Sequence, residues 1–457
     1  MRKIERRGVF CLILAALLGL GLAFFCFRFV MNGGEWASYP YNRHLYTDSG
    51  VLKGGTILDR DGDVLSALDV SGARVYFDDA DVRRATLHAV GDAAGNIGAG
   101  ALTAFADKLS GYNVLTGAYS PLGAGNQVTL TIDAYLNNIA YQALGGMRGT
   151  VGVYNYKNGE ILCMVSAPTF DPANPPDIDP DDPAWEGVYV NRLMNANSIP
   201  GSIFKVVTLT AAIEKLPDLF SRHWTCTGST EIGGDVVTCP YAHGELDIED
   251  ALAVSCNGVF GELAVELGGA TMQEYTDAAG LTRPVEVDGI TSARGYFNFS
   301  GSDNQLAWAG VGQGEDTMCP ISMMQYMGAI AGGGQAAVPR LVARSTTSFG
   351  LPTGVYFPSK SAKLIDRTTA RTIADMMHNN VIETYGESRF PGMDICAKSG
   401  TAEVGPDRTP NAWFTGFLRD PATPYAFIVL VENGGGGSSV AGSVASRVLT
   451  AAVEKGY

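Results

Sequence analysis

An uncharged apolar segment near the N-terminus, residues 9–27, limits the architectures open to this chain more than any other feature. As a helix it would extend roughly 28 Å, enough to cross the hydrocarbon core of a bilayer. Basic residues flank the cytoplasmic end of a membrane helix, and four of them precede this segment: Arg2, Lys3, Arg6 and Arg7. We therefore expect a cytoplasmic tail (1–8), a single-pass transmembrane anchor (9–31) and an extracytoplasmic remainder.

A cleaved signal peptide is the alternative for the same segment. Such a peptide ends in a cleavage site of small residues, and no convincing site of that kind follows the apolar run. Phe24 and Phe25 before Cys26 are also too bulky for a lipoprotein site. We expect the segment to stay as an anchor.

Composition narrows the class of protein. Hydrophobic residues make up 46% of the 457 residues, so the chain can bury a large core and global disorder is excluded. The net charge of -15 argues against a surface that binds nucleic acid.

The pattern along the chain predicts an α+β fold. Strand patterns appear early and late, and helical patterns dominate from residue 204 to about 275, so distant parts of the chain should share one sheet. A small N-terminal module (35–125) should precede a larger domain (126–457).

Individual elements can be predicted along the chain. The N-terminal part should contain a strand–turn–strand at 54–65 with its turn at Asp61-Gly62, a helix at 101–109, a strand at 128–133 and a helix at 134–144 capped by Asp133. A hairpin at 149–165 turning at 157–159 and an extended loop at 168–183 should follow. The C-terminal part should contain strands at 413–417 and 426–431 and a helix at 440–453.

Ser202 and Lys205 are the strongest candidate for chemistry. Residues three apart share one face of a helix, and Pro200-Gly201 forms a turn before an apolar helical run. A lysine buried against a serine can lose its charge and accept the hydroxyl proton. The helix N-terminus would favour the developing negative charge. An exposed lysine near an N-cap serine is the alternative for this spacing alone.

A serine nucleophile of this kind needs a relay hydroxyl and an amide to hold the substrate. Two Ser-x-Asn patterns are present, Ser255-Cys256-Asn257 and Ser302-Asp303-Asn304. The first lies between two helix-like segments that would hold it rigidly, whereas the second lies in a Gly- and Ser-rich loop. We choose Ser255 and Asn257.

Lys398-Ser399-Gly400-Thr401 is the third element, and it contains the one Lys-Ser/Thr-Gly pattern in the chain. Gly400 would let a substrate backbone approach a strand closely. Lys398 would supply fixed positive charge, and the Ser399 and Thr401 hydroxyls would bind a carboxylate. A surface strand end is the alternative for the tripeptide taken alone.

The cysteines suggest one covalent link and no metal. Cys226 and Cys239 flank a Gly-rich loop and could form a disulfide worth about 3 kcal/mol outside the cell, or remain two reduced thiols. We expect no zinc site, because none of the cysteines belongs to a Cys-x-x-Cys pair and the one histidine near them is His243. No cofactor is expected.

Taken in this order, the three motifs resemble those of the penicillin-binding proteins. The chain is similar to the class B members, the membrane-anchored peptidoglycan D,D-transpeptidases, over nearly everything after the anchor. Residues 56–62, 128–133, 159–166, 312–314 and 412–414 also resemble landmarks of that family. The short N-terminal module resembles that of the small actinobacterial and clostridial members.

The resemblance implies a penicillin-binding transpeptidase domain above a pedestal or dimerisation-type module. It implies that Ser202 is acylated by stem peptides ending in D-Ala-D-Ala, or by β-lactams, with Lys205 as general base and Ser255 as proton shuttle. Asn257 would hold the substrate amide, and the terminal carboxylate would meet Lys398, Ser399 and Thr401. The backbone N–H groups of Ser202 and Thr401 would form the oxyanion hole.

The same resemblance leaves several functions open. A D,D-carboxypeptidase or a β-lactamase would use the same residues and release the acyl group to water. A β-lactam sensor and a catalytically silent scaffold are less favoured, because the chain offers no sensor domain before the anchor and has every expected catalytic side chain. The resemblance also implies a membrane-embedded glycan polymerase of the SEDS type as a partner.

Overall fold

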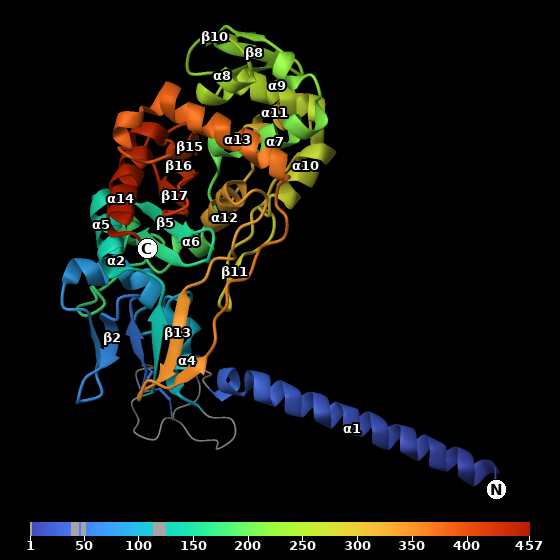
Figure 1. Cartoon of the computed structure of the whole chain (residues 1–457), viewed down its shortest axis with the longest axis vertical. Helices are drawn as coiled ribbons and strands as arrows, with labels where there is room; N and C mark the ends of the chain where they lie inside the picture. Colours follow the sequence, from blue (N-terminus) through green and yellow to red (C-terminus); the bar gives the residue numbers. More distant parts are fainter. Residues whose placement is uncertain (1, 38–44, 47–51, 113–124) are drawn as a thin grey trace.

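The computed structural model describes residues 2–37, 45–46, 52–112 and 125–457. Its first element, α1 (Arg2–Ala37), extends away from the rest of the molecule (Figure 1). Among the described residues, one helical segment is long and apolar enough to cross a membrane, Arg6–Val30. Its large side chains are well exposed, with Leu18 at 76% and Phe24 at 66%. This matches the predicted anchor in position and length.

The main body is built on a five-stranded antiparallel sheet in the order β15-β16-β17-β5-β6. Strands from the middle and the end of the chain lie side by side, as the pattern of the sequence predicts. The strands are β5 (Gly149–Asn155), β6 (Ile161–Ala167), β15 (Ile395–Ala402), β16 (Asn411–Leu418) and β17 (Tyr425–Val431). Because β15 has a partner on one side alone, its other backbone edge is free of strand pairing.

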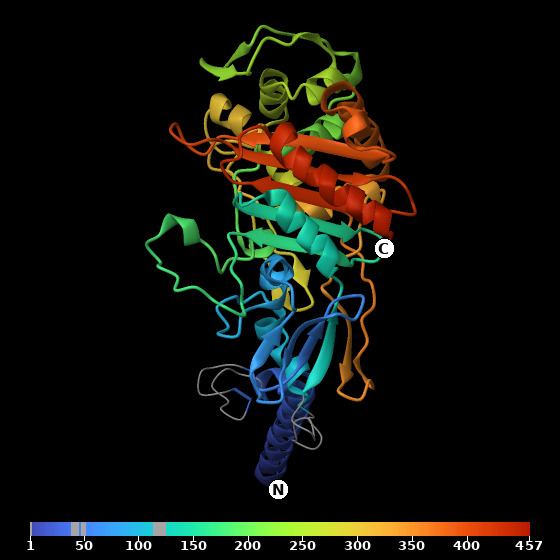
Figure 2. The same ribbon diagram turned by 90° about the vertical axis from the view of Figure 1, so that its left-hand side faces the viewer.

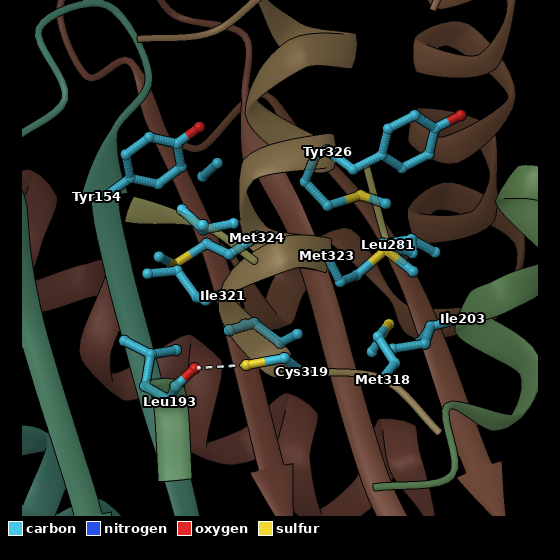
Figure 3. Packing of buried hydrophobic residues seen from close by; sticks show 14 of the residues in the cluster. Tyr154, Leu193, Ile203, Leu281, Met318, Cys319, Ile321, Met323, Met324 and Tyr326 are labelled. Atoms are coloured by element: carbon cyan, nitrogen blue, oxygen red, sulfur yellow. Dashed lines mark hydrogen bonds between the residues drawn. The ribbon is translucent and has the colours of Figure 1, made fainter. Parts of the chain in front are cut away.

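Helices cover both faces of this sheet, so the strands are buried on both sides. Along β17, Val429 packs on one face and Ile428 and Leu430 on the other, which is the two-residue period of a strand. The helices α5 (Ala134–Leu144) and α14 (Gly442–Lys455) lie across one face (Figure 2). The opposite face is covered by α12 (Pro320–Ala331), whose Met323 and Met324 point into the core shown in Figure 3.

A group of helices forms the part of the molecule farthest from the N-terminus (Figure 1). Its members are α7 (Lys205–Lys215), α8 (Ile248–Ala253), α9 (Asn257–Leu267), α10 (Gly269–Ala278), α11 (Asp303–Gly310) and α13 (Arg367–Asn380). Two hairpin-like sheets interrupt them: β7 (Trp224–Cys226) with β10 (Gly244–Leu246), and β8 (Ser229–Ile232) with β9 (Asp235–Thr238). The prediction that helices dominate residues 204 to about 275 is confirmed by α7–α10, but it misses the strands of residues 224–246, which are short and mostly exposed.

A second sheet of six strands lies nearer α1, in the order β14-β13-β4-β1-β2-β3. Its strands are β1 (Thr56–Leu58), β2 (Val64–Leu68), β3 (Arg74–Tyr76), β4 (Asn126–Leu130), β13 (Val342–Thr347) and β14 (Pro352–Gly354). Half of these strands come from beyond residue 125, the expected end of the N-terminal module. The lower part of the molecule is thus assembled from two distant parts of the chain rather than from residues 35–125 alone.

Smaller elements complete the fold. The helix expected at 101–109 is divided at Phe105 into two short helices, because Phe105 leaves the α region at φ -113° and ψ 25°. The other short elements are α2 (Ala80–Val90), α3 (Ala101–Ala104), α4 (Ala106–Ser110), α6 (Arg192–Asn195), β11 (Glu286–Val287) and β12 (Ile290–Thr291).

The predicted turn at Asp61-Gly62 is the joint between the two sheets. Asp59 accepts hydrogen bonds from two backbone N–H groups of its own turn, at 3.0 and 2.9 Å, and from Ala134 N at the start of α5, at 3.2 Å. Lys455 from the last turn of α14 binds both Asp61 and Asp133. The N-terminal strands are therefore fixed to the first and last helices of the upper domain.

Candidate active site

Ser202 lies on a tight turn in front of a buried helix. The turn is a 3₁₀-helix, η2 (Gly201–Phe204), and α7 begins directly after it at Lys205. Side chains three apart eclipse in a 3₁₀-helix, so the geometry that brings Ser202 to Lys205 is tighter than the α-helix expected from the sequence. Ile203 on the same turn points into the core near Met318 (Figure 3), which fixes the turn from behind.

Lys205 is fully buried and is surrounded by oxygen atoms. Its Nζ lies 3.1 Å from Ser202 Oγ and 3.1 Å from Ser255 Oγ. It also lies 2.6 Å from the carbonyl oxygen of Ser255 and 2.7 Å from Asn257 Oδ1. The structure thus brings the first two predicted motifs together around one amine.

The chemistry of these four neighbours suits a neutral lysine. Burial lowers the pKa of Lys205 to about 7, so a large share of the amine is uncharged near neutral pH. A neutral amine has two N–H donors and one lone pair. The Ser255 carbonyl and Asn257 Oδ1 can only accept, and they can take both donors. The lone pair then remains for a hydroxyl proton, and Ser202 is in reach to give one.

Ser255 and Asn257 are held by an unusual backbone. Ser255 has φ 58°, in the left-handed region that residues other than glycine rarely occupy. The Ser255 N–H donates to Leu252 O at 3.2 Å, at the end of α8, and Asn257 is the first residue of α9. The Asn257 side-chain amide donates to Thr238 O at 2.7 Å, which leaves its oxygen for Lys205. Strain of this kind clusters at functional sites.

Lys398 is also fully buried, on the edge strand β15. Its Nζ donates to Ser255 Oγ at 3.0 Å and to Ser399 O at 2.9 Å. Burial, followed by the nearby charge of Lys205, holds the pKa of Lys398 well below its usual value. The geometry therefore favours a lysine that holds the Ser255 hydroxyl, whereas the sequence suggested a fixed charge for a carboxylate.

The free edge of β15 faces the Ser202 turn. Ser399 N donates to Tyr385 OH at 2.9 Å, a group outside the sheet, so the N–H of Ser399 points away from β16. N–H groups of an edge strand alternate in direction, so Thr401 N also points outward. Ser202 N lies in the first turn of η2, where backbone N–H groups have no partner within the helix. Both are available as donors for an oxyanion.

The absence of a side chain at Gly400 is needed for the packing of the Ser202 turn against β15, and not only for the approach of a substrate backbone. A Cβ at this position would lie 3.1 Å from Ile203 Cγ2 and 3.2 Å from Pro200 O. The Ser202 turn therefore rests directly on β15, and glycine permits that approach. Ser399 is half-buried and Thr401 is exposed, and Thr401 Oγ1 accepts from Gly437 N at 3.3 Å.

Two contacts that support the site lie outside the three motifs. Tyr385, on a π-helical turn (Val381–Tyr385), reaches Ser399 N across the fold. Gly312 O accepts from Gly201 N at 2.8 Å and holds the start of the Ser202 turn. The rejected Ser302 instead caps α11, where its hydroxyl accepts from Gln305 N at 3.3 Å. Only the landmark at 312–314 pointed to any of these contacts.

Of the two alternatives left open for Cys226 and Cys239, the structure has the free thiols and not the disulfide. A third cysteine enters the same space, and Cys239 Sγ lies 3.8 Å from Cys256 Sγ. Cys256 is the middle residue of the Ser255–Asn257 motif, so this group of sulfurs adjoins the site.

Comparison with known proteins points in one direction. The model of the penicillin binding protein transpeptidase domain matches residues 149–450. The peptidoglycan D,D-transpeptidase PbpA of Mycolicibacterium smegmatis is 28% identical over 361 residues, which cover 73% of each chain.

Solved structures agree on the fold. The D,D-transpeptidase domain of a peptidoglycan glycosyltransferase from Eggerthella lenta superimposes with a TM-score of 0.76 at 28% identity, over 88% of this chain and 98% of that one. Penicillin-binding protein A of M. tuberculosis, solved as a ceftriaxone acyl-enzyme complex, gives a TM-score of 0.75 at 22% identity, over 88% of this chain and 98% of that one.

Proposed function

The chain belongs to the penicillin-binding protein transpeptidase family, and on that premise we propose that it is a peptidoglycan D,D-transpeptidase that works through a Ser202 acyl-enzyme. The observation that carries the proposal is the position of the buried Lys205 amine, 3.1 Å from the hydroxyls of both Ser202 and Ser255. A nucleophile, its base and a proton relay are thus within hydrogen-bond reach of one another.

In the first half-reaction, neutral Lys205 takes the Ser202 hydroxyl proton as Ser202 Oγ attacks the carbonyl carbon of the penultimate D-Ala. The oxyanion that forms would be held by the N–H groups of Ser202 and Thr401, at about 3–4 kcal/mol per donor. The proton passes through the Ser255 hydroxyl to the leaving nitrogen. The peptide C–N bond then breaks, and the terminal D-Ala departs as a free amine.

In the second half-reaction, an amine from a neighbouring stem peptide attacks the ester. Lys205 takes a proton from the attacking amine and passes it to Ser202 Oγ as the C–O bond to Ser202 breaks. A peptide cross-link remains, and the serine hydroxyl and the neutral lysine are restored. The names of the relatives, which are D,D-transpeptidases, favour this outcome over a D,D-carboxypeptidase or a β-lactamase. Asn257 would hold the substrate amide, and the Ser399 and Thr401 hydroxyls would bind its terminal carboxylate.

Covalent labelling of the full-length protein in detergent tests the first half. A fluorescent penicillin should label the wild type at one site per chain, and Ser202→Ala should remove the label. Ser302→Ala is the matched control and should label normally. Label that survives in Ser202→Ala would sink the proposal.

Product analysis tests the second half. A stem peptide ending in D-Ala-D-Ala is supplied together with an amine acceptor, and products are identified by mass. The transpeptidase should form the cross-linked product. If water alone accepts the acyl group at every acceptor concentration, the hydrolytic alternative is right.

We further propose that α1 holds the enzyme in the membrane with its N-terminus in the cytoplasm, and that the lower sheet docks a SEDS-type glycan polymerase. The support for docking is a group of exposed apolar side chains at the β13–β14 end of that sheet: Phe349, Leu351, Val355 and Phe357. Phe349→Ser with Leu351→Ser should end co-purification of the polymerase. Phe220→Ser, an exposed phenylalanine in the upper domain, is the control. Co-purification that persists in the double variant would count against this docking surface.

A further inference from the structure

Four potential metal ligands meet beside the catalytic motif. Cys226, Cys239, His243 and Cys256 each offer one ligand atom, and these atoms all lie within 4.8 Å of one another. They come from the end of β7, the residue after β9, the loop before β10 and the turn before α9. The sequence hides this group, because Cys226 and His243 are 17 residues apart, as are Cys239 and Cys256.

The distances fit a tetrahedral ion. Two thiolates bound to zinc at about 2.3 Å lie about 3.8 Å from each other when the angle is tetrahedral. The Sγ atoms of Cys239 and Cys256 are 3.8 Å apart, and Cys226 Sγ is 3.3 Å from His243 Nδ1. A disulfide bond would instead bring two sulfurs to about 2.05 Å, and it would leave the third cysteine and the histidine unused.

The surroundings also suit a metal-bound thiolate. Asn257 N donates to Cys239 Sγ at 3.2 Å, which is the kind of outer hydrogen bond that orients a ligand. Cys226 and Cys256 are buried, and Cys239 and His243 are half-buried, so the group is shielded without being closed. Three soft sulfurs and one imidazole select zinc over calcium or magnesium.

Residues 224–246 carry three of the four ligands, and few other interactions stabilise this segment. Residues 224–246 form two separate two-stranded sheets, and such pairs are marginal by themselves. Few side chains of these strands are buried: Cys226, Ile232, Val237 and Leu246. A structural ion can supply the missing stability in so small a unit.

We propose that Cys226, Cys239, His243 and Cys256 bind one structural zinc ion that fixes the Ser255–Asn257 turn. Cys256 lies between Ser255 and Asn257. Asn257 in turn donates hydrogen bonds to Cys239 Sγ from its backbone N–H and to Thr238 O from its side-chain amide. The ion joins these two segments and holds Ser255 in its left-handed backbone conformation. Zinc is a positioning group here and takes no part in the acyl transfer.

Metal content of the full-length protein is the direct test. The protein is purified in detergent without a chelator or a polyhistidine tag, and metals are measured by mass spectrometry. We expect one zinc per chain, and the same stoichiometry in Cys11→Ser, a cysteine on α1 outside the group. His243→Ala and Cys226→Ser should each lose most of the zinc. Zinc that stays at one per chain in both variants would overturn the site.

Intact mass separates zinc from a disulfide. Denatured, unreduced wild-type protein should carry the full mass of reduced thiols. A mass lower by two hydrogens, together with no zinc, would assign a disulfide and overturn the proposal. Failure of metal-free reduced protein to take up added zinc at micromolar concentration would do the same.

The effect on the active site has its own readout. Removing zinc from the wild type with a chelator should slow acylation by a fluorescent penicillin roughly tenfold or more, and zinc but not magnesium should restore it. Unchanged acylation in the zinc-free protein would overturn the positioning role. The metal stoichiometry does not depend on the proposed reaction, so the two proposals fail separately.

Discussion

Two buried lysines meeting at one hydroxyl define this site at the scale of single residues. Lys205 and Lys398 both contact Ser255 Oγ, at 3.1 and 3.0 Å. Two ammonium groups so close in a dry site would repel each other. The arrangement is stable because burial lets at least one amine stay neutral, and that amine becomes the base.

This protonation predicts how acylation depends on pH. Burial lowers the pKa of Lys205 to about 7, so its active, neutral form is lost as the pH falls below 7. The second-order rate of penicillin acylation should fall about tenfold per pH unit below 7 and level off above it. Stopped-flow measurements between pH 5 and 9 check this, and a flat profile would contradict it.

Lys205→Arg is the companion variant. Arginine keeps its proton in this range, so acylation at pH 8 should drop by about 10²–10⁴-fold. The variant should also lose the dependence on pH that Lys205 gives the wild type. A melting curve close to that of the wild type would show that the loss is chemical.

Asp316 provides a separate prediction about stability. Burial raises the pKa of its carboxyl group to about 7, although Asn298 N donates to it at 2.9 Å. A folded-state pKa above the unfolded value means that the folded protein holds the proton more tightly. The resulting stabilisation is complete below about pH 4 and is lost as the pH rises through 7.

Asp316→Asn should remove this dependence. At pH 8 the variant should be more stable than the wild type by on the order of 2 kcal/mol, and at pH 4 the advantage should vanish. Denaturant unfolding at both pH values measures it, with the exposed Asp407→Asn as control. An equal effect at both pH values would contradict the account.

At the scale of elements, local signals predicted well and distant ones did not. Asp133 caps α5 over the range expected, with its carboxylate accepting from Leu136 N at 2.6 Å, because a cap and a periodic helix are written in neighbouring residues. The hairpin of β5 and β6 was equally readable. The strands β7–β10 could not be predicted, because short exposed strands bury too few side chains to show a two-residue period of apolar residues.

The same contrast holds for the site. Ser202, Lys205, Ser255, Asn257 and Lys398 could be named from three motifs, and the structure brings them into contact. The contact of Tyr385 could not be named, and the spacing of the cysteines argued against the zinc site that we now propose, since both join segments that touch only after folding. The burial of Lys398 could not be predicted either, because spacing does not reveal it. Its role toward the substrate carboxylate stays a prediction.

Gly400 tests how closely two elements must approach. In Gly400→Ala the new Cβ would meet Ile203 and the Pro200 carbonyl at 3.1–3.2 Å, closer than most real contacts, so the Ser202 turn must shift. We expect penicillin acylation to fall by about 10- to 100-fold, since small misplacements of reacting groups are costly. Stopped-flow labelling measures the rate. Gly98→Ala, where a Cβ meets nothing within 4 Å, should label normally. Normal acylation in Gly400→Ala would show that the turn can relax.

At the scale of the whole molecule, the two sheets do not belong to two successive domains of the chain. After β4 the chain rises into the upper domain, returns as β13 and β14, and rises again to α13 (Figure 1). The joint at Asp59–Asp61 adds contacts from α5 and α14. Flexing between the two parts is therefore restricted by several connections rather than one.

The proposed orientation of the molecule in the membrane rests on α1. Basic residues before the apolar segment predict a cytoplasmic N-terminus. In intact spheroplasts, added protease should cleave the catalytic domain and spare an N-terminal tag. Cleavage that requires lysis would reverse this orientation.

The three crossings between the sheets have a mechanical consequence. Peptidoglycan is under tension from turgor, and an enzyme acylated by a stem peptide is briefly part of that stretched network. A pull on Ser202 reaches the lower sheet along three chain segments and the Lys455 contacts with Asp61 and Asp133, so the load between the two sheets is divided.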